Sequence, residues 1–528
     1  MYLLWLGLLL TCSLLQAQPN DNSKKSKENP HTNIVINTFK EPNEPTIAVH
    51  PTNNNILMAG SNISHLYISE DAGLTWKVRT LRSTYGVWGD PVIVADTAGS
   101  FYFFHLSNPP GGNWIDRIVC QRSDDNGRTW TNGSYMGLNG KKAQDKHWAT
   151  IDPITNYIYV TWTQFDKYNS SNPKDKSCIL FSMSKDGAKT WTSAKKINEK
   201  DGDCLDGDNT TEGAVPCIGP NGEVYVVWAG PLGLMFDRSL DGGATWLDDD
   251  INIDPMPTGW EYKVPGIYRS NGLPISACDR TGGPNHGTIY VNWTDQRNGA
   301  NDTDVWLAKS TDQGNTWTKP IRVNDDKAGN HQFFTWMSLD PTNGYLYFVF
   351  YDRRGLRGDL TNVYMARSTD GGETFVNFKI NDKPFSPNEG IFFGDYNNLV
   401  AKGDLVRPVW TRLDGVQLSV KTALIDVSAI PLSSPAVEET TSIADSSLTD
   451  PNVLYTSFKL PKAQKVSWSI YNRWGQEVTT IFKCKALEAG KHIHSVKFSE
   501  LDLIRGEQYY HRVWHKKTVY QERSFFMK

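Results

Sequence analysis

An eight-residue box recurs six times along this chain and constrains its fold more than any other feature. The first copy is SEDAGLTW, Ser69–Trp76. The later copies begin at Ser123, Ser184, Ser239, Ser310 and Ser368. Successive copies are 54, 61, 55, 71 and 58 residues apart. Repeats of this length indicate one supersecondary unit that packs against copies of itself.

Each box lies inside a unit of four short apolar runs. In the first unit, TIAVHPTNN, ILMAG and HLYIS precede the box, and in later units runs such as KPIRVND and NFKIND follow it. Alternating and β-branched runs separated by Asn, Gly and Pro turns predict β-strands. We label the strands of a unit a, b, c and d, so that the box is the turn between strands c and d.

A seventh unit carries no box. GDYNNLVAKGD, LVRPVWTRLDG and VQLSVKTAL supply its strands a, b and c, but no strand d follows. Residues 33–40, NIVINTFK, look like a strand d and precede the first strand a. We expect them to complete the seventh unit and close a ring, which leaves no unpaired inner edge. The predicted fold is therefore all-β: a seven-bladed β-propeller over residues 33–426, with roughly 56 residues per blade.

The box residues suit a tight turn. Asp71 can accept hydrogen bonds from the backbone ahead of it, Gly73 can take a positive φ, and Thr75 can bond back to the turn. Because six copies around a ring cannot line one site, we expect the box aspartates to be structural; they are Asp71, Asp125, Asp186, Asp241, Asp312 and Asp370. The third copy has Ala188 in place of the glycine, which predicts a distorted turn.

The pattern S-x-D-x-G-x-T-W resembles the Asp-box, or BNR repeat, of the sialidase-like β-propellers. Its six copies span most of residues 33–426. The resemblance implies a propeller fold. It does not settle activity, because Asp-box propellers include sialidases, other glycosidases and non-catalytic binding proteins.

Charged residues gather at the predicted ends of strands b and starts of strands a. These positions converge around the central channel on the face opposite the boxes, the box-free face, because turns of antiparallel strands alternate between faces. They are Glu44, Asp90, Asp145, His147, Glu212, Asp295, Arg297, Asp352, Arg353, Arg354, Asp395, Tyr396 and Arg412. Arginines beside carboxylates could hold an anionic or polyhydroxylated ligand; alternatively, they form salt bridges between neighbouring blades.

A sialidase, as the resemblance implies, holds its substrate with three arginines and uses a tyrosine–glutamate pair and an aspartate acid/base. The ligand-binding candidates are then Arg297, Arg353 and Arg412, together with Asp295, Asp352, Asp395 and His147. The catalytic candidates are Tyr396, Glu212, Asp90 and Glu44. Three departures stand against this assignment: the early F/Y-R-I-P motif is absent, the arginines fall in consecutive units, and sialidases have six blades.

Two functions follow as alternatives. One is a sialidase-like protein that binds or hydrolyses extracellular carbohydrate or glycoprotein on the box-free face. The other is a non-catalytic adhesion or scaffold protein that binds a protein partner through the same face. Glycan binding predicts a deep mouth where the candidate arginines and Tyr396 converge. Scaffolding predicts that those groups pair with each other over a shallow, plugged channel.

The loop Asp201–Asn209, DGDCLDGDN, is the one candidate for a cofactor. Its alternating oxygen side chains resemble a calcium loop, but it lacks the downstream glutamate of an EF-hand, and a solvated acidic loop is the alternative. We expect no other metal or cofactor. Cys204 and Cys217 flank this region; they form a disulfide or remain buried thiols.

The N-terminus carries an apolar run from Tyr2 to Leu15 that ends at small and polar residues near Ala17. This pattern predicts a signal peptide over residues 1–18. No later stretch is long and apolar enough to span a bilayer. The net charge of −4 argues against a nucleic-acid partner. We expect a protein that is secreted or attached to the cell surface after Sec export.

Residues 427–450 are rich in Ser, Thr, Pro and acidic residues and predict a linker. Residues 451–528 alternate in the manner of seven to eight short strands, which predicts a small C-terminal β-sandwich. They resemble the sorting domain of the type IX secretion system in the LP before the first strand, IYN-x-x-G-Q-E-V, AGKH and the basic end FMK. The resemblance implies a Bacteroidetes-type bacterium and the type IX machinery as a partner.

Overall fold

The structure, a computed structural model, describes residues 30–430, 453–460, 462–472, 477–501, 503–504, 508–515 and 518–526. They belong to two compact units that divide between residues 434 and 435. The predicted signal peptide and most of the predicted linker lie outside the described residues. Regular structure is almost all strand, apart from the 3-10 turns η1 (Val427–Ala429) and η2 (Phe498–Glu500). Across the described ranges, no helix is long and apolar enough to cross a membrane.

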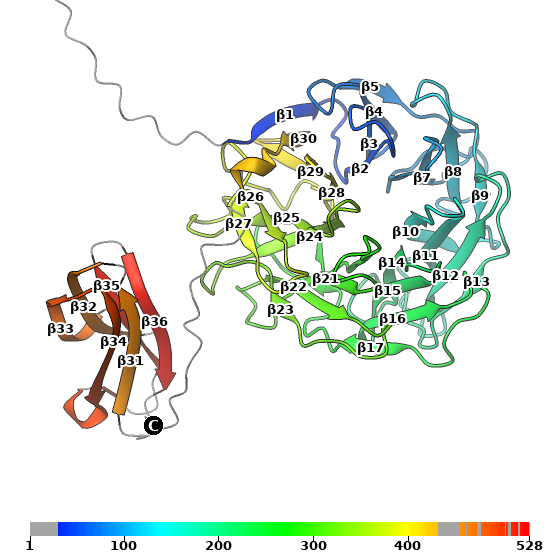
Figure 1. Cartoon of the computed structure of the whole chain (residues 1–528). Helices are drawn as coiled ribbons and strands as arrows, with labels where there is room; N and C mark the ends of the chain where they lie inside the picture. The colour runs from blue at the N-terminus through cyan, green and yellow to red at the C-terminus, as the bar shows by residue number, and fades with distance from the viewer. Residues whose placement is uncertain are drawn as a thin grey trace, which may run out of the picture. The chain divides into compact units, whose positions relative to one another are not determined.

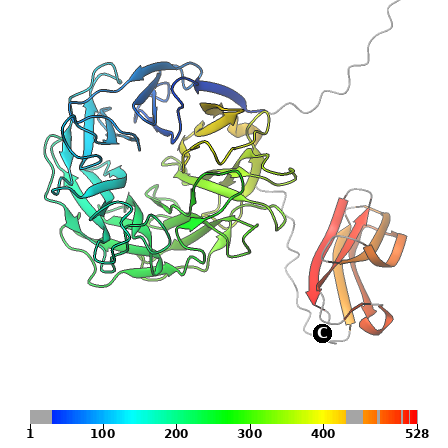
Figure 2. The ribbon, with the colours of Figure 1, turned by 180° about the vertical axis from the view of Figure 1, so that it is seen from behind.

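The larger unit contains seven four-stranded antiparallel sheets that lie around a ring (Figures 1 and 2). The first two are β2 (Thr46–Val49), β3 (Leu57–Ser61), β4 (His65–Ser69), β5 (Lys77–Thr80), and β6 (Val92–Ala95), β7 (Phe101–Leu106), β8 (Ile118–Ser123), β9 (Ser134–Met136). The third and fourth are β10 (Ala143–Ile151), β11 (Ile158–Phe165), β12 (Ser177–Ser184), β13 (Lys195–Lys196), and β14 (Glu212–Ile218), β15 (Val224–Gly230), β16 (Gly233–Ser239), β17 (Ile251–Asp254).

The fifth and sixth sheets are β20 (Ile275–Cys278), β21 (Ile289–Asp295), β22 (Asp304–Ser310), β23 (Ile321–Arg322), and β24 (Gln332–Leu339), β25 (Leu346–Asp352), β26 (Asn362–Ser368), β27 (Val376–Lys379). The seventh is β28 (Asn398–Lys402), β29 (Leu405–Asp414), β30 (Gln417–Leu424), β1 (Thr32–Asn37). A small hairpin, β18 (Glu261–Tyr262) with β19 (Ser270–Asn271), is inserted between the fourth and fifth sheets. This insertion accounts for the longest interval between boxes.

The first strands of the sheets form the inner circle of the ring. Contacts run from β2 to β6, β10, β14, β20, β24 and β28 and back to β2. Each box joins the third and fourth strands of its sheet, as Ser69–Trp76 joins β4 to β5. The predicted order a, b, c, box, d therefore describes the first six sheets.

The two ends of the larger unit meet in one sheet. β1 pairs with β30 in antiparallel register, with Thr32 opposite Leu424 and Ile34 opposite Thr422. Residues 33–40 were predicted to fill this place, and the strand itself ends at Asn37. The circle of sheets thus closes by hydrogen bonds between segments far apart in the chain.

The box turns are held by their own side chains. In the first copy, Asp71 Oδ1 accepts hydrogen bonds from Ser69 Oγ (2.8 Å) and the Thr75 N–H (2.9 Å), and the Gly73 N–H donates to Ser69 Oγ (2.8 Å). The Thr75 hydroxyl donates to Asp71 Oδ2 at 2.5 Å. The other five copies repeat these four bonds. The aspartate of each box is therefore engaged within its own turn.

The third turn does not show the predicted distortion. Ala188 adopts a φ of 62° and donates its N–H to Ser184 Oγ at 3.0 Å, as the glycines do elsewhere. The difference lies in the tryptophan. Trp191 Nε1 donates to Ser134 Oγ (2.7 Å), whereas Trp76 Nε1 donates to the carbonyl of Gly73 (3.1 Å). Ala188 thus adopts a left-handed backbone conformation that costs glycine less free energy.

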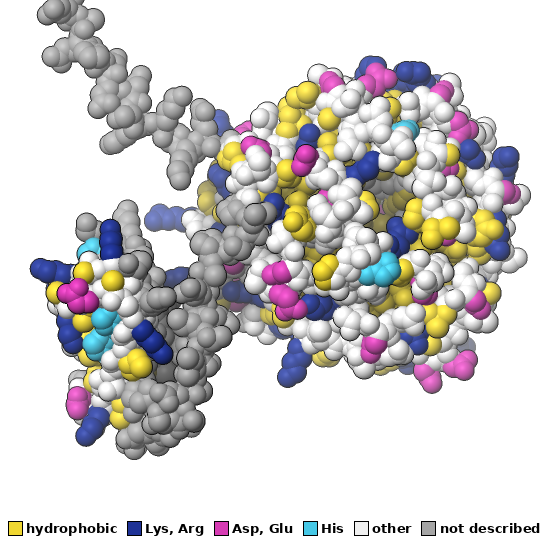
Figure 3. Space-filling model, viewed as in Figure 1, with side chains coloured by type: hydrophobic (Ala, Val, Ile, Leu, Met, Phe, Trp, Pro, Cys, Tyr) yellow, Lys and Arg dark blue, Asp and Glu magenta, His cyan; other side chains and the backbone are white. Residues whose placement is uncertain are grey.

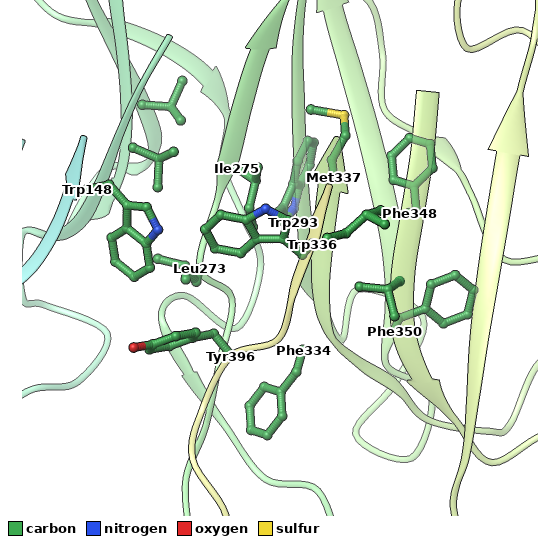
Figure 4. Close-up of a cluster of buried hydrophobic side chains, with 14 of the residues drawn as sticks. Trp148, Leu273, Ile275, Trp293, Phe334, Trp336, Met337, Phe348, Phe350 and Tyr396 are labelled. Atoms are coloured by element: carbon green, nitrogen blue, oxygen red, sulfur yellow. The ribbon is translucent and has the colours of Figure 1, made fainter. Parts of the chain in front are cut away.

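Buried aromatic side chains from different sheets gather in one hydrophobic cluster (Figure 4). Trp148 on β10 packs against Trp336 on β24 with a centroid separation of 5.7 Å, and against Tyr396 edge to face at 5.5 Å. All three side chains are buried. Because β10 and β24 belong to sheets that are not neighbours in the circle, these contacts cross the interior. We call these three residues the aromatic plug.

All six cysteines of the described residues are free thiols. Cys217 lies on β14, whereas Cys204 lies in a loop that bridges to Ser170. The suggested disulfide between Cys204 and Cys217 is therefore wrong, and the alternative of buried thiols holds. Burial raises the pKa of the Cys217 thiol to about 12, which keeps it protonated.

The smaller unit has its own core. Its strands are β31 (Val453–Leu460), β32 (Gln464–Asn472), β33 (Glu477–Leu487), β34 (Gly490–Lys497), β35 (Gln508–His515) and β36 (Thr518–Phe526). β31 pairs with β34, and the other four form a sheet in the order β33-β32-β35-β36. Phe458, Trp468 and Val513 are among the buried residues. Six strands lie in the described residues, fewer than the seven to eight predicted.

Candidate functional site

A pocket of about 350 Å³ opens among the loops of the box-free face. Its lining comes from the loops before strands a and between strands b and c, with Glu44, Asp90 and Asp145 from the first three sheets. Arg269, in the turn between β18 and β19, and Phe392, in the loop before β28, also line it. The volume lies within the roughly 300–1,000 Å³ that is usual for small-molecule sites. We call it the acidic pocket.

Buried Lys146 and partly buried Arg269 hold the carboxylates of the acidic pocket together. Lys146 Nζ lies 3.2 Å from Asp395 Oδ2 and 3.5 Å from Asp90 Oδ2. Arg269 bonds Asp395 through Nη2 and Asp206 Oδ2 through Nη1, the latter at 2.8 Å. Asp395 and Lys146 are 1% and 3% exposed, so this network is shielded from water. Buried charges of this kind require such partners.

The backbone at the starts of strands a turns these side chains into the centre. The register of β10 against β11 shifts between Asp145 and Trp148. Lys146, inside that bulge, has a φ of 42°, and Glu44 and Asp90 also have positive φ, at 54° and 49°. Non-glycine residues seldom adopt this conformation, and β-bulges redirect side chains next to functional sites. Three residues with positive φ thus lie where the charged groups meet.

Opposite charges set the protonation of the two central ions. Burial alone would raise the pKa of Asp395, but Arg269 and Lys146 lower it well below its usual range. Burial alone would lower the pKa of Lys146, but Asp395 and Asp90 raise it. Asp395 is therefore a permanent carboxylate, and Lys146 a permanent cation, across the physiological pH range.

Two carboxyl groups that line the same pocket behave in the opposite way. Burial, followed by Asp395 and Asp90, raises the pKa of Glu44 well above its usual range. Burial and the Asp90 carboxylate raise the pKa of Asp145 to about 7. One pocket thus contains a carboxylate with a lowered pKa, Asp395, beside carboxyl groups with raised pKa values, an arrangement that separates acid and base roles.

Glu212 and His147 lie deeper, beneath the pocket. Glu212 is fully buried, and burial together with Asp206 and Asp145 raises its pKa well above the usual range. Burial lowers the pKa of His147 to about 4, so this imidazole is neutral. Neither residue lines the acidic pocket. The pocket wall therefore does not include these two candidate residues.

Aromatic rings surround the mouth of the acidic pocket. Trp88 and Trp114 are 40% and 44% exposed. Trp114 meets Tyr168 edge to face at 5.5 Å, and the Tyr168 hydroxyl donates to Asp206 Oδ2 at 2.9 Å. Exposed rings over a polar floor match the apolar faces and polar edges of sugars.

The three candidate arginines do not converge on this pocket. Arg297 bonds Asp254 Oδ1 at 2.7 Å as well as Asp295. Arg353 donates to the Pro265 carbonyl at 2.7 Å and Arg412 to the Lys383 carbonyl at 2.6 Å. Asp352 is engaged by Arg354 at 2.7 Å. Each arginine has its own partners. This arrangement is nearer to the alternative expectation that these arginines form salt bridges within the fold than to a shared ligand clamp.

The tyrosine–glutamate pair is not assembled either. Tyr396 belongs to the aromatic plug, and the Lys146 ammonium lies 5.7 Å from its ring centroid. Burial, then Asp90 and Glu44, raises the pKa of Tyr396 well above its usual range, which makes it a poor nucleophile. Neither carboxyl oxygen of Glu212 accepts a hydrogen bond from the Tyr396 hydroxyl.

Sequence reasoning missed Lys146, Arg269 and the role of Asp206. Asp206 lies in the acidic loop considered for calcium, and it instead accepts bonds from Arg269, Tyr168 and Trp260 Nε1 (3.2 Å). Among the residues described, no cluster of three or more His, Cys, Asp or Glu is arranged to hold a metal ion. In the sequence, only the long interval between the fourth and fifth boxes indicates the inserted segment that carries Arg269.

A second cavity, of about 650 Å³, lies among the strands a and the a–b turns, where Cys217, Cys278 and Trp336 contribute to its lining. Because Trp336 belongs to the aromatic plug, this cavity reaches the plug from the face of the boxes. Figure 3 shows the larger unit hollowed near its centre, with hydrophobic side chains inside the hollow. The molecule therefore has separate cavities on its two faces.

Comparison with known proteins gives structural neighbours but no close relative. No protein-family model and no curated protein matches the chain. Solved structures that resemble it include an α-L-arabinanase of Penicillium chrysogenum with arabinobiose (15% identity, 76% of this chain and 99% of that one, TM-score 0.40). Others are an ulvan lyase (11%, 74% and 95%, 0.44) and the NanB sialidase of Streptococcus pneumoniae (9%, 65% and 68%, 0.40). The activity proposed below rests on this chain's own site.

Proposed function

We propose that this protein binds a neutral, hydroxyl-rich glycan in the acidic pocket and hydrolyses a glycosidic bond there. The observation that carries the proposal is the pairing of Asp145, whose pKa is raised to about 7, with the Asp90 carboxylate in one pocket. Glycoside hydrolysis needs such a pair, one group protonated and one ionised.

The chemistry assigned to the pair is general acid–base catalysis. Asp145 donates its proton to the glycosidic oxygen as the bond to the sugar carbon breaks. The Asp90 carboxylate stabilises the positive charge that develops on the sugar ring and accepts a proton from the attacking water. Lys146 holds Asp90 and Asp395 in place without contributing a proton. Exposed Trp88 and Trp114 stack on the sugar rings.

The charge balance favours a neutral sugar over an acidic one. Lys146 and Arg269 are already paired with Asp395, Asp90 and Asp206. A bound carboxylate would lie among acidic groups. The proposal therefore departs from sialic acid, the substrate that the sequence resemblance first suggested.

A second candidate function is non-catalytic binding of a protein partner on the same face. It is favoured by the engagement of Arg297, Arg353 and Arg412 with other groups and by the aromatic plug across the channel. In this case the acidic pocket serves as a recognition surface without turnover.

One experiment separates the two. The purified full chain is tested on neutral and sialylated chromogenic glycosides and on a glycan array. Turnover of neutral glycosides that is lost in Asp145→Asn and Asp90→Asn but kept in Asp404→Asn, an exposed control, supports the first function. Glycan binding without turnover supports a non-catalytic role. If neither binding nor turnover occurs, the glycan proposal fails.

We also propose that the seven sheets are the blades of a seven-bladed propeller, and that the protein is exported with residues 1–18 as signal peptide and 451–528 as sorting domain. The ring of sheets and the separate C-terminal unit support this organisation. Cell fractionation of the full chain and of a chain without residues 451–528 tests it. Retention of the shortened chain inside the cell is the expected result, and equal export would contradict the sorting role.

A further inference from the structure

We propose that the glycan site extends beyond the acidic pocket across two further hollows, so that the ligand is a chain of several sugars rather than a single terminal unit. The inference rests on the proposed function. It adds the length of the ligand and assigns a role to arginines that the proposed chemistry does not use.

The two hollows adjoin each other on the box-free face. One, of about 840 Å³, is lined by residues 263–265, by Ile267 and Tyr268, and by Glu389 and Gly390. The other, of about 700 Å³, is lined by residues 385–389 and by Asp359 and Asp414. They share Pro265 and Glu389 in their walls. Together they form one continuous depression between the long loops of the fourth-to-fifth and sixth-to-seventh sheets.

A single aromatic ridge separates this depression from the acidic pocket. Tyr268 lines the larger hollow, and its ring meets Phe392 edge to face at 6.0 Å. Phe392 lines the acidic pocket, and the Arg269 guanidinium lies 5.6 Å from its ring centroid. An oligosaccharide that extends out of the acidic pocket therefore has to pass only Phe392 and Tyr268 to reach the depression.

The surface on this path suits sugars. Tyr268 is 65% exposed, which is unusual for a large ring held by a neighbouring ring, and leaves it free to stack on a sugar. The carboxylates of Asp359, Glu389 and Asp414 offer acceptors for hydroxyl groups along the depression. Each unit of a neutral polysaccharide presents an apolar ring face, which can stack on Tyr268, and hydroxyl groups, which can donate to these carboxylates.

The arginines fix the loops that form the walls. Arg353 donates to the Pro265 carbonyl at 2.7 Å, and its other Nη lies 3.5 Å from Asp359 Oδ1. Arg412 donates to the carbonyls of Lys383 (2.6 Å) and Pro384 (3.4 Å). Arg353 and Arg412 are thus positioning residues. Loops held in one conformation bind a chain without the entropic cost of ordering first.

The test is the dependence of affinity on chain length. The full-length protein is first tested on an array of neutral oligosaccharides, with each sugar type present in every length from disaccharide to hexasaccharide. Dissociation constants for the oligosaccharides that bind are then determined by calorimetry. We expect the hexasaccharide of the bound sugar to bind about tenfold or more tightly than its disaccharide. Tyr268→Ala removes this gain and leaves disaccharide binding unchanged.

Two further variants sharpen the result. Arg353→Lys keeps the charge but not the forked geometry, so it is expected to reduce the hexasaccharide gain while disaccharide affinity stays the same. Tyr135→Ala, which removes an exposed ring on β9, changes neither affinity. Equal affinity for disaccharide and hexasaccharide overturns the extended site and leaves the acidic pocket intact. Absence of binding to every sugar overturns the proposed function and this inference with it.

Discussion

The two faces of the ring use aspartate in opposite ways. On the face of the boxes, the Thr316 hydroxyl and backbone N–H lower the pKa of Asp312 to about 2. On the box-free face, burial and the Asp90 carboxylate raise the pKa of Asp145 to about 7. The first carboxylate is satisfied by residues within its own turn, and the second is surrounded by groups from distant sheets. The difference separates an aspartate that stabilises the fold from one that can move a proton.

The largest effect is expected from removing the central cation. Lys146→Met leaves Asp395 and Asp90 buried without their ammonium partner, so the free energy of unfolding should fall by about 3–5 kcal/mol. Urea unfolding followed by tryptophan fluorescence measures the loss. Lys77→Met removes the exposed pair with Glu70 on the face of the boxes and should leave the unfolding midpoint close to that of the unaltered protein. Similar losses in both variants would contradict the contrast between the faces.

The next effect concerns the acid itself. Because Asp145 must be protonated to donate, turnover of a neutral glycoside should decline as pH rises through about 7. Asp145→Asn should lower the rate by roughly 10²–10⁴-fold and abolish this alkaline limb. A pH–rate profile of both proteins measures this. An alkaline limb that persists in the variant would assign the titrating group elsewhere.

A smaller effect is expected from a box aspartate. Asp312→Ala removes the bonds to Thr316 and Ser310 and should cost about 1 kcal/mol of unfolding free energy, with catalysis unchanged. Because the folded-state pKa is lowered, the contribution is present at neutral pH and is lost as pH falls from about 4 toward 2. Urea unfolding at neutral pH and at the acid end, with Asp404→Ala as the control, checks both parts. Loss of turnover in Asp312→Ala would contradict a purely structural role for this box aspartate.

The smallest effect is expected at the variant box. Ala188→Gly relieves a residue with a φ of 62°, while the added freedom of glycine in the unfolded chain opposes the gain. The protein should become more stable by less than about 1 kcal/mol. The shift of the thermal midpoint measures it. A clear loss of stability would mean that the alanine methyl group packs usefully, which Gly73 and its counterparts cannot do.

The contrast between the faces also explains what could be predicted from the sequence. The box turns and the order of strands depend on residues within one unit, and Ser69, Asp71 and Thr75 bond as their spacing suggests. The acidic pocket depends on which units meet across the ring, and spacing along the chain does not encode that. Glu44 and Asp90 were found because strand starts converge on one face.

The residues that were missed share one reason. Arg269 lies in an insertion that follows no repeat, and Lys146 points inward because of a bulge that the alternation of β10 does not reveal. The arginines chosen as a ligand clamp pair with their neighbours instead of converging on one pocket. Backbone geometry and burial, rather than residue type, determine which of these charged side chains reach the acidic pocket.

The closure of the ring by β1 has a consequence for the order of folding. Thr32 pairs with Leu424, so the first strand to leave the ribosome cannot find its partner until almost the whole larger unit has been made. Contacts this distant in sequence slow folding, because a long loop must close before they form. During synthesis β1 therefore waits without its partner strand until β30 has been made. The ring can thus become complete only after translation has passed residue 424.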